Sequence, residues 1–442
     1  MLKFYFATIS ISVFLLNAQA QQLAGSEQKW NLHAQATAIT QYHLPFSAKY
    51  SGTNSLRTKE AAATSFTSTL YAGVRLWKNG AIYFNPEIAG GKGLSQVTGI
   101  AGFPNGETFR IGSPAIKLYL ARLYLQQYFS LGYATETVED EANQLKAIIP
   151  KRYILLQAGK FSISDFYDNN SLSNDPRTQF INWSLMSTGG WDYPANTRGY
   201  TVGLSVGYHQ PSFSLKAAIT QVPKIANGPI LDNNIGKAFG TVVEAEKEYK
   251  LSKEKKIVIR IACFYNRAHA GNYDVSVKNA LTNSTTPDIE LTRLYSRSKA
   301  GFYINTEYNF TNGGVFLTGS WNDGKNETWA FTEIDHSVST GISLNGKRWN
   351  RGNDVVGLAV VCNGISSQHS NYLKQGGYGF MMGDGTLNYG LESILETYYS
   401  LQLPFKLVRV FISPNYQFVL NPAYNKDRGP VHIVAVRLHV EI

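Results

Sequence analysis

Charged and aromatic side chains recur at alternate positions of several short segments, with apolar residues between them. In one such segment Ile82, Phe84 and Ile88 share one parity, whereas Tyr83 and Glu87 share the other. Successive side chains of an extended strand point to opposite faces, so each segment would present one apolar and one polar face. The polar set comprises Arg75, Tyr83, Glu87, Arg122, Tyr124, Arg260, Tyr303, Glu307, Glu396, Arg409 and Arg437, with Lys92 on an adjoining loop.

These residue types suit weak binding of a polyhydroxylated molecule. Guanidinium and carboxylate groups form hydrogen bonds with hydroxyls, and aromatic rings pack against C–H faces. Both charge signs are present, so the set would not select strongly for anions or for cations. Weak contacts let a solute leave as easily as it enters, which conduction requires. The set therefore favours passive diffusion of mono- and oligosaccharides, although each charge could instead form a salt bridge that only stiffens a wall.

The elements that would position these side chains are strands. About sixteen segments of roughly ten residues alternate apolar and polar side chains between turn signals, which is the pattern of an outer-membrane β-barrel. Residues 300–310, 394–403 and 432–442 are clear examples. The last of these segments could pair with the first strand and remove both sheet edges. We expect an all-β fold, a transmembrane antiparallel barrel in which some long loops fold into the lumen.

The glycine-rich stretch 89–115 is the first candidate for such a loop. It is too long for an ordinary turn, and loops of this length are usually functional or disordered. Its apolar residues Leu94, Val97, Ile100 and Phe103 favour a packed conformation beside Glu87. Residues 162–195 form a second long connection, which carries the charged residues Asp165, Asp168, Asp175 and Arg177.

The composition agrees with a membrane barrel. Charged residues make up only 16% of the 442 residues, against roughly 25% in soluble domains. The 39 glycines and 27 tyrosines suit many turns and aromatic girdles at two membrane interfaces. The net charge of +10 is scattered along the chain, so it indicates a basic lumen or a rim facing lipid and lipopolysaccharide rather than nucleic acid.

Residues 1–20 have the features of an export signal. Lys3 supplies a positive charge, an apolar run follows, and Ala18 and Ala20 give the small-residue cleavage pattern. We expect cleavage after Ala20, a single barrel domain over residues 21–442, and a location in the bacterial cell outer membrane. No other stretch is apolar over the 18 residues that a membrane-spanning helix needs.

The cysteines and histidines show no cofactor pattern. Cys263 and Cys362 could form a disulfide in an oxidising compartment, but Cys263 lies on an apolar face, where a cysteine acts as a small apolar side chain. Paired Cys and His spacings are absent from the sequence, so we expect neither a metal nor another cofactor.

Three blocks of the chain resemble one protein family. The run FNPEIAGGKGLSQVTGIAGFPNGE at 84–107, the stretch 155–170 and the stretch 420–438 are similar to the OprB-like carbohydrate-selective porins. The resemblance implies an outer-membrane barrel that admits sugars by diffusion and that is a monomer. Such barrels usually end in an aromatic residue, whereas this chain ends in Ile442.

Four other functions remain open at this level. A general, non-selective porin would have the same strand pattern, and a passive pore could export polysaccharide as well as import sugars. A barrel enzyme would need a nucleophile and a base, and the chain has no G-x-S-x-G elbow; we therefore expect no enzyme. A soluble sugar-binding protein would need its apolar faces to meet in a core.

Overall fold

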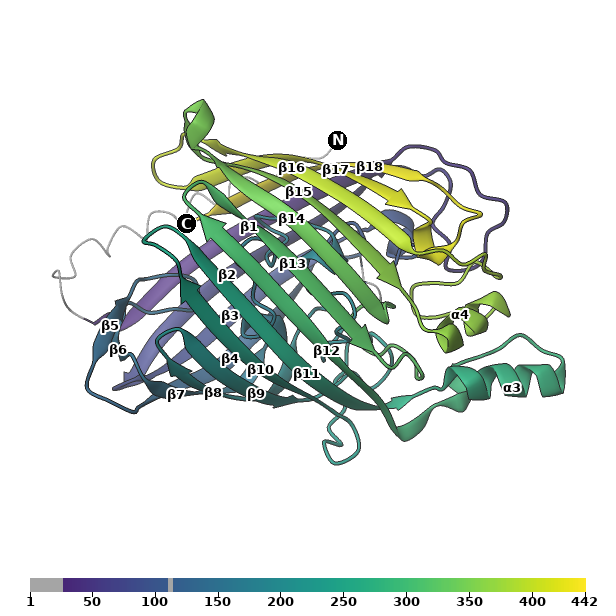
Figure 1. The fold of residues 1–442 in the computed structure, drawn as a ribbon, viewed down its shortest axis with the longest axis horizontal. Coiled ribbons are helices and arrows are strands. Elements are labelled where there is room, and N and C mark those ends of the chain that lie inside the picture. Colours follow the sequence, from purple (N-terminus) through teal and green to yellow (C-terminus); the bar gives the residue numbers. More distant parts are fainter. Residues whose placement is uncertain (1–26, 110–113) are drawn as a thin grey trace.

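Sixteen antiparallel strands close into one barrel (Figure 1). The computed structural model describes residues 27–109 and 114–442, so the predicted signal and its cleavage after Ala20 lie outside the described residues. The strands of the wall are β1 (Trp30–His43), β2 (Ala63–Trp77), β3 (Gly80–Gly91), β4 (Lys117–Ser130), β7 (Tyr153–Phe161), β8 (Thr201–Gln210), β9 (Phe213–Thr220), β10 (Phe239–Lys250), β11 (Lys256–Ala270), β12 (Leu294–Phe310), β13 (Gly313–Asn322), β14 (His336–Gly346), β15 (Arg351–Gly364), β16 (Glu392–Leu403), β17 (Arg409–Leu420) and β18 (Val431–Glu441).

The first and last strands close the barrel. Ala38 of β1 lies opposite Leu438 of β18, and Tyr42 lies opposite Val434. This pairing satisfies the backbone groups of both edges, which a bilayer could not do. The expected closure and the strand number are confirmed, and the outer wall exposes apolar side chains such as Phe302.

A bulge between β3 and β4 changes which side chains of β4 face inward. Asn85 lies opposite Arg122, but Pro86 lies opposite Leu120, so Ala121 is an extra residue. Proline has no N–H for the ladder and is tolerated in a sheet at such irregularities. Strict alternation from Leu123 and Leu125 would place Tyr119 on the apolar face. In the structure its hydroxyl donates to Glu87 on the inner side.

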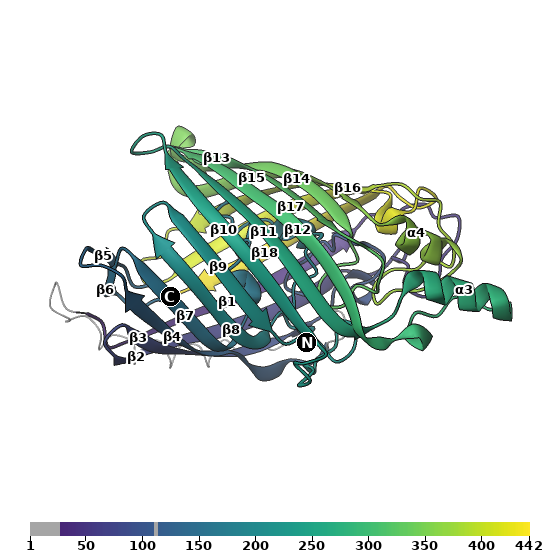
Figure 2. The same ribbon diagram turned by 60° about the horizontal axis from the view of Figure 1, so that its bottom comes forward.

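The two ends of the barrel differ. At the short-turn end, two residues join β2 to β3, β8 to β9 and β12 to β13. At the long-loop end lie two helices, α3 (Tyr273–Asn283) and α4 (Ser367–Lys374), which extend beyond the wall in both views (Figures 1 and 2). No helix in the described part of the chain is long and apolar enough to cross a membrane.

Two long connections fold into the barrel and fill much of it. Leu94, Ile100 and Phe103 of the first are buried, as are Trp183 and Trp191 of the second. Their rings and those of the inner wall form one apolar cluster. The expected packing of the glycine-rich stretch 89–115 is therefore confirmed for its described residues 89–109. The short helices of these and other connections are α2 (Trp183–Met186), η3 (Leu94–Gln96), η4 (Ile163–Asp165), η5 (Glu290–Thr292), η6 (Lys347–Trp349) and η7 (Pro422–Tyr424).

A hairpin stands at the short-turn end, in the acidic connection between β4 and β7. It consists of β5 (Thr135–Val138) and β6 (Ala147–Pro150), which pair only with each other. These strands are too short for alternation to be recognised in the sequence. The hairpin contacts the mouth of the barrel, where the Leu145 N–H donates to the Tyr83 hydroxyl at 3.4 Å.

The cysteines do not form a disulfide. Both are free, and both are exposed. Cys263 lies between the outward-facing Ile261 and Tyr265 on β11. Among the residues that the structure describes, no group of three or more His, Cys, Asp or Glu side chains could hold a metal ion.

Candidate functional site

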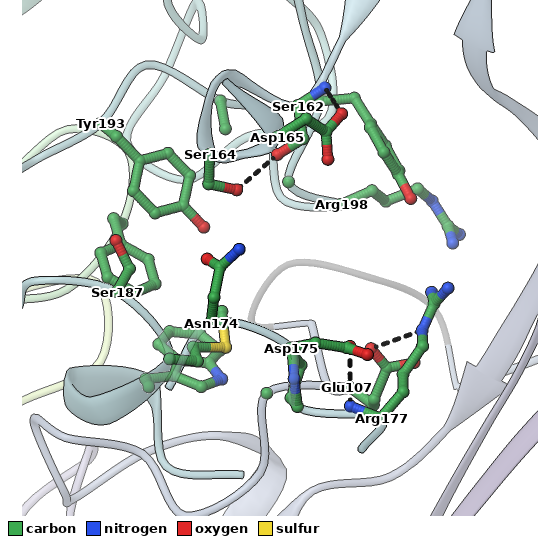
Figure 3. A pocket seen from close by; sticks show the side chains of 18 of the residues that line it. Glu107, Ser162, Ser164, Asp165, Asn174, Asp175, Arg177, Ser187, Tyr193 and Arg198 are labelled. Atoms are coloured by element: carbon green, nitrogen blue, oxygen red, sulfur yellow. Dashed lines mark hydrogen bonds and ion pairs between the residues drawn. The ribbon is translucent and has the colours of Figure 1, made fainter. Parts of the chain in front are cut away.

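A cavity of about 440 Å³ lies inside the barrel, between the inserted connections and the wall. Figure 3 shows polar side chains around it, with Tyr193 and Asn174 facing Arg198 and Arg177 across the space. Most of the lining comes from the segments 106–109, 162–165, 174–177 and 193–200, together with Arg122 and the hairpin residues Ala142 and Asn143.

Arg122 and Asp165 form a two-pronged ion pair at this cavity. The guanidinium Nη2 lies 2.6 Å from Oδ1, and Nε lies 2.7 Å from Oδ2. Asp165 is fixed in turn by the N–H of Ser162 at 3.1 Å. The Arg122 guanidinium also lies 5.2 Å from the centre of the Tyr200 ring. Paired forks of this kind have a fixed geometry, so both groups present hydrogen-bonding atoms at defined places.

Arg177 reaches across the cavity to the wall. It binds Glu107 of the other inserted connection at 3.0 Å and Glu87 of β3 at 2.9 Å. Glu87 is buried and also accepts a hydrogen bond from the Tyr200 hydroxyl at 3.1 Å. A charge buried in this way is stable only when it is paired and hydrogen-bonded. The pairs therefore join both inserted connections to the wall.

Carboxylates on the strands hold the inserted connections through main-chain N–H groups. Glu396 accepts from Ile181 at 2.8 Å and from Asn182 at 3.0 Å. Glu307 accepts from Ser171 at 2.9 Å. Bonds from N–H groups to a carboxylate are stronger than neutral ones, so these glutamates fix the shape of the connection that forms the cavity.

The family model of the OprB carbohydrate-selective porins matches residues 53–442. The chain belongs to the OprB family. It is an outer-membrane porin for carbohydrates, and the resemblance noted in its sequence is confirmed. A comparison with curated proteins found no match.

One solved porin structure agrees with this assignment at the level of fold. The high-pH structure of Pseudomonas putida OprB matches with a TM-score of 0.69 at 14% identity, over 94% of each chain. The low-pH structure of that protein matches with a TM-score of 0.46 at 12% identity, over 94% of this chain and 93% of the other. Salmonella typhi OmpF in complex with daunomycin gives 0.49 at 9% identity, over 96% and 100%. The first match shows a shared fold.

The family places the barrel in the membrane. Short turns of outer-membrane barrels face the periplasm, and long loops face the cell exterior. In this OprB porin the β5–β6 hairpin is therefore at the periplasmic mouth, and the helices α3 and α4 are outside the cell.

All the residues predicted from the sequence to bind solute lie in the described ranges. Among them, Arg122 lines the cavity of this OprB porin. Glu87 lies directly behind the lining and holds Arg177. Glu307 and Glu396 bind main-chain N–H groups, as described above. Arg437 is buried, and its guanidinium donates to the main-chain carbonyls of residues 176, 178 and 179. These charged residues of β12, β16 and β18 thus hold the inserted connection instead of facing an open lumen.

The predicted tyrosines are also enclosed. Tyr83 and Tyr124 pack against each other with ring centres 5.2 Å apart. Tyr303 packs on Trp191 and donates to Glu244 at 2.5 Å. None of these three rings is more than 3% exposed, because the inserted connections cover the inner wall.

The remaining predicted cations lie away from the cavity. Arg260 is buried between Glu246, at 2.6 Å, and Glu307, at 3.1 Å. Arg75 donates to the main-chain carbonyls of residues 28 and 146 near the periplasmic mouth. Arg409 is exposed and pairs with Glu441 at the barrel end, and Lys92 is exposed on its loop.

The cavity is also lined by the loop charges Glu107, Asp165, Asp175, Arg177 and Arg198, for which the sequence predicted no role. A strand parity cannot identify loop residues, since the orientation of a loop side chain depends on the fold of the loop. The available signal was the concentration of Asp165, Asp175 and Arg177 in a connection too long for a turn.

Two nearby carboxylates in the extracellular loop 323–335 have opposite pKa shifts. Burial raises the pKa of Glu333. Burial would raise the pKa of Asp335 as well, but His369 at 3.1 Å and Lys299 at 3.6 Å offset it and hold that pKa below its usual range. The paired Asp335 carboxylate therefore stabilises the fold above its unfolded pKa of about 3.9, and this contribution is lost as the pH falls through the lower folded pKa.

We expect Asp335→Asn to lower the melting temperature of the detergent-solubilised barrel at neutral pH, because it leaves Lys299 and the His369 ring without their carboxylate partner. The difference from the wild type should shrink as the pH falls below about 4. Glu333→Gln is the matched control, since Gln resembles the protonated form that burial favours; its relative stability should rise with pH. A constant deficit of Asp335→Asn at every pH would contradict the assignment.

Proposed function

We propose that carbohydrates cross this porin by passive diffusion and bind weakly in the 440 Å³ cavity. The observation that carries the proposal is the set of paired charges on the lining, Arg122 with Asp165 and Arg177 with Glu107. Each pair places hydrogen-bond donors beside acceptors, and the two charges of the pair nearly cancel. A sugar hydroxyl is both a donor and an acceptor, so it matches such pairs better than a simple ion does.

We further infer that one chain forms a complete channel and has no catalytic role. The sixteen strands of one chain close on themselves around the cavity, which supports a monomer as the conducting unit. The mass of the purified protein–detergent complex tests this proposal. A general, non-selective porin is the alternative, and it would conduct without any effect of sugar.

Single-channel conductance in a planar bilayer tests the sugar site. We expect glucose or a disaccharide to block the open channel partly and in proportion to its concentration. Arg122→Gln should weaken this block by about tenfold, the effect of losing one hydrogen bond to a charged group, and should raise cation selectivity because Asp165 loses its partner. Arg348→Gln, which removes a charge from an exposed turn, is the control. An unchanged block in Arg122→Gln would contradict the proposed site.

A further inference from the structure

A second cavity, of about 220 Å³, lies at the extracellular end of the barrel. Four of the long loops of that end contribute to its lining, through Ile225, Arg293, Glu327 and Phe380 among others. None of these residues lines the central cavity. This second cavity, called the outer pocket below, is therefore a separate space on the side from which a nutrient arrives.

The Arg293 guanidinium and the Glu327 carboxylate form a two-pronged ion pair in the outer pocket. Nε lies 3.0 Å from Oε2, and Nη2 lies 2.7 Å from Oε1. The Glu327 carboxylate also accepts from the Gly271 N–H at 3.0 Å. The centre of the Trp329 ring lies 5.5 Å from the guanidinium carbon. The pair is therefore held in one orientation by the main chain and by an aromatic face.

Part of this guanidinium is left for a ligand. Within the described residues Nη1 of Arg293 has no hydrogen-bond partner, and this atom is not buried. Glu290 lies 3.2 Å from Nη2, with a side chain that is 67% exposed. Two carboxylates thus face one guanidinium, so the outer pocket does not favour an anion. A sugar hydroxyl can accept from Nη1 and donate to a carboxylate oxygen.

Tyr378 and Phe380 add aromatic residues to the lining, and both are partly exposed. Phe380 packs against the apolar cluster that contains Ala226 and Trp329. Aromatic rings are large apolar surfaces, against which the C–H face of a sugar can pack. The volume of about 220 Å³ is below the range of about 300–1,000 Å³ that is typical of sites for drug-sized ligands, so it suits one sugar ring.

The outer pocket and the central cavity adjoin the same two chain segments. Ala226 lines the outer pocket and Asn227 the central cavity, and Glu327 and Ala330 divide in the same way. The Asn227 N–H donates to the Trp329 carbonyl at 2.7 Å, and its side-chain amide donates to the Ala330 carbonyl at 2.6 Å. These bonds join the two segments, so a sugar in the outer pocket is held next to the central cavity.

We propose that the outer pocket is a first binding site for neutral sugars on their way to the central cavity. This inference rests on the proposed function of the central cavity. The Arg293–Glu327 pair holds the hydroxyls, and Phe380 packs against the ring of the sugar. A sugar bound there has exchanged part of its water for protein contacts before it reaches the central cavity, so entry from the extracellular side becomes faster. Binding stays weak enough for release, as conduction requires.

Block by sugar from one side at a time tests the proposal on the full-length, folded barrel. Glucose is added to the extracellular or to the periplasmic chamber of single channels of known orientation. Arg293→Lys keeps the positive charge but lacks the planar fork, and Phe380→Leu keeps an apolar side chain but lacks the ring. We expect each to slow the onset of block by extracellular glucose about two- to tenfold, the effect of losing one hydrogen bond or a contact of similar strength. The onset from the periplasmic chamber should match that of the wild type.

Arg57→Lys is the matched control, because it makes the same substitution at an exposed position of another extracellular loop; it should change neither onset rate. Unchanged extracellular onset in both variants, or equal slowing from the two chambers, would overturn the outer pocket as a sugar site and leave the proposed function in place. Wild-type channels that glucose blocks from neither chamber would overturn the proposed function itself.

Discussion

Arg437→Met is expected to destabilise the barrel strongly and to abolish block by sugar while the channel still opens. Arg437 is only 1% exposed. Its guanidinium donates to the carbonyls of Pro176 at 2.8 Å and Thr178 at 3.0 Å. These residues flank Arg177, which lines the cavity. Methionine fills a similar volume but donates no hydrogen bond, so the carbonyls stay buried without partners.

The expected loss in the free energy of unfolding is about 1–3 kcal/mol for each main-chain carbonyl that is left without its donor. The segment around Arg177 should then move, and the sugar-contacting pairs should separate. The melting temperature of the folded barrel and the half-blocking sugar concentration are the measurements.

Arg409→Met is the matched control, because it removes an arginine from the neighbouring strand. The Arg409 side chain is 68% exposed and pairs with Glu441 at 3.0 Å. Exposed ion pairs contribute about 0–1 kcal/mol, so this variant should resemble the wild type in both measurements. Equal losses in the two variants would show that Arg437 does not hold the inserted connection.

Removal of the β5–β6 hairpin is expected to raise the single-channel conductance, because the hairpin fills part of the pore. The tip residues Ala142 and Asn143 line the central cavity. The hairpin is held there by Asn31, which donates to Asp140 at 2.7 Å, and by Asn85, which donates to Asn143 at 2.9 Å. It thus occupies the periplasmic exit of the path that a sugar would take.

A short Gly–Ser linker in place of residues 135–150 makes this test, because the flanking strands β4 and β7 already pair in the wall. Asp140→Asn is a milder variant. Its carboxylate oxygen lies 3.0 Å from His33, so neutralising it should loosen the hairpin and increase the variation in open-channel current. An unchanged conductance after removal of the hairpin would mean that the narrowest point lies elsewhere.

Alternation in the sequence was sufficient for the wall of the barrel. Strands such as β12 and β18 were recognisable, because each residue type must suit either lipid or interior wherever it lies along the strand. The same rule failed at Tyr119, where the bulge opposite Pro86 shifts the parity. It also did not detect the β5–β6 hairpin, whose strands have four residues each.

The parity of a strand predicts that a side chain points into the barrel, but it does not predict which segment covers that side chain. Glu396 and Arg437 do point inward, yet the backbone of the connection 162–200 lies over both and uses their hydrogen bonds. Such contacts join residues more than two hundred positions apart, and no local pattern encodes them.

The amino-acid sequence was therefore enough to predict the barrel, its closure, its location in the outer membrane and its family, since these depend on local periodicity and on long, unusual motifs. Only the tertiary structure decided which charges meet at the cavity. Arg177 is paired and Arg198 is not, because the folds of two inserted loops set the distance from each arginine to a carboxylate. That distance depends on how the loops pack, and no pattern in the sequence predicts it.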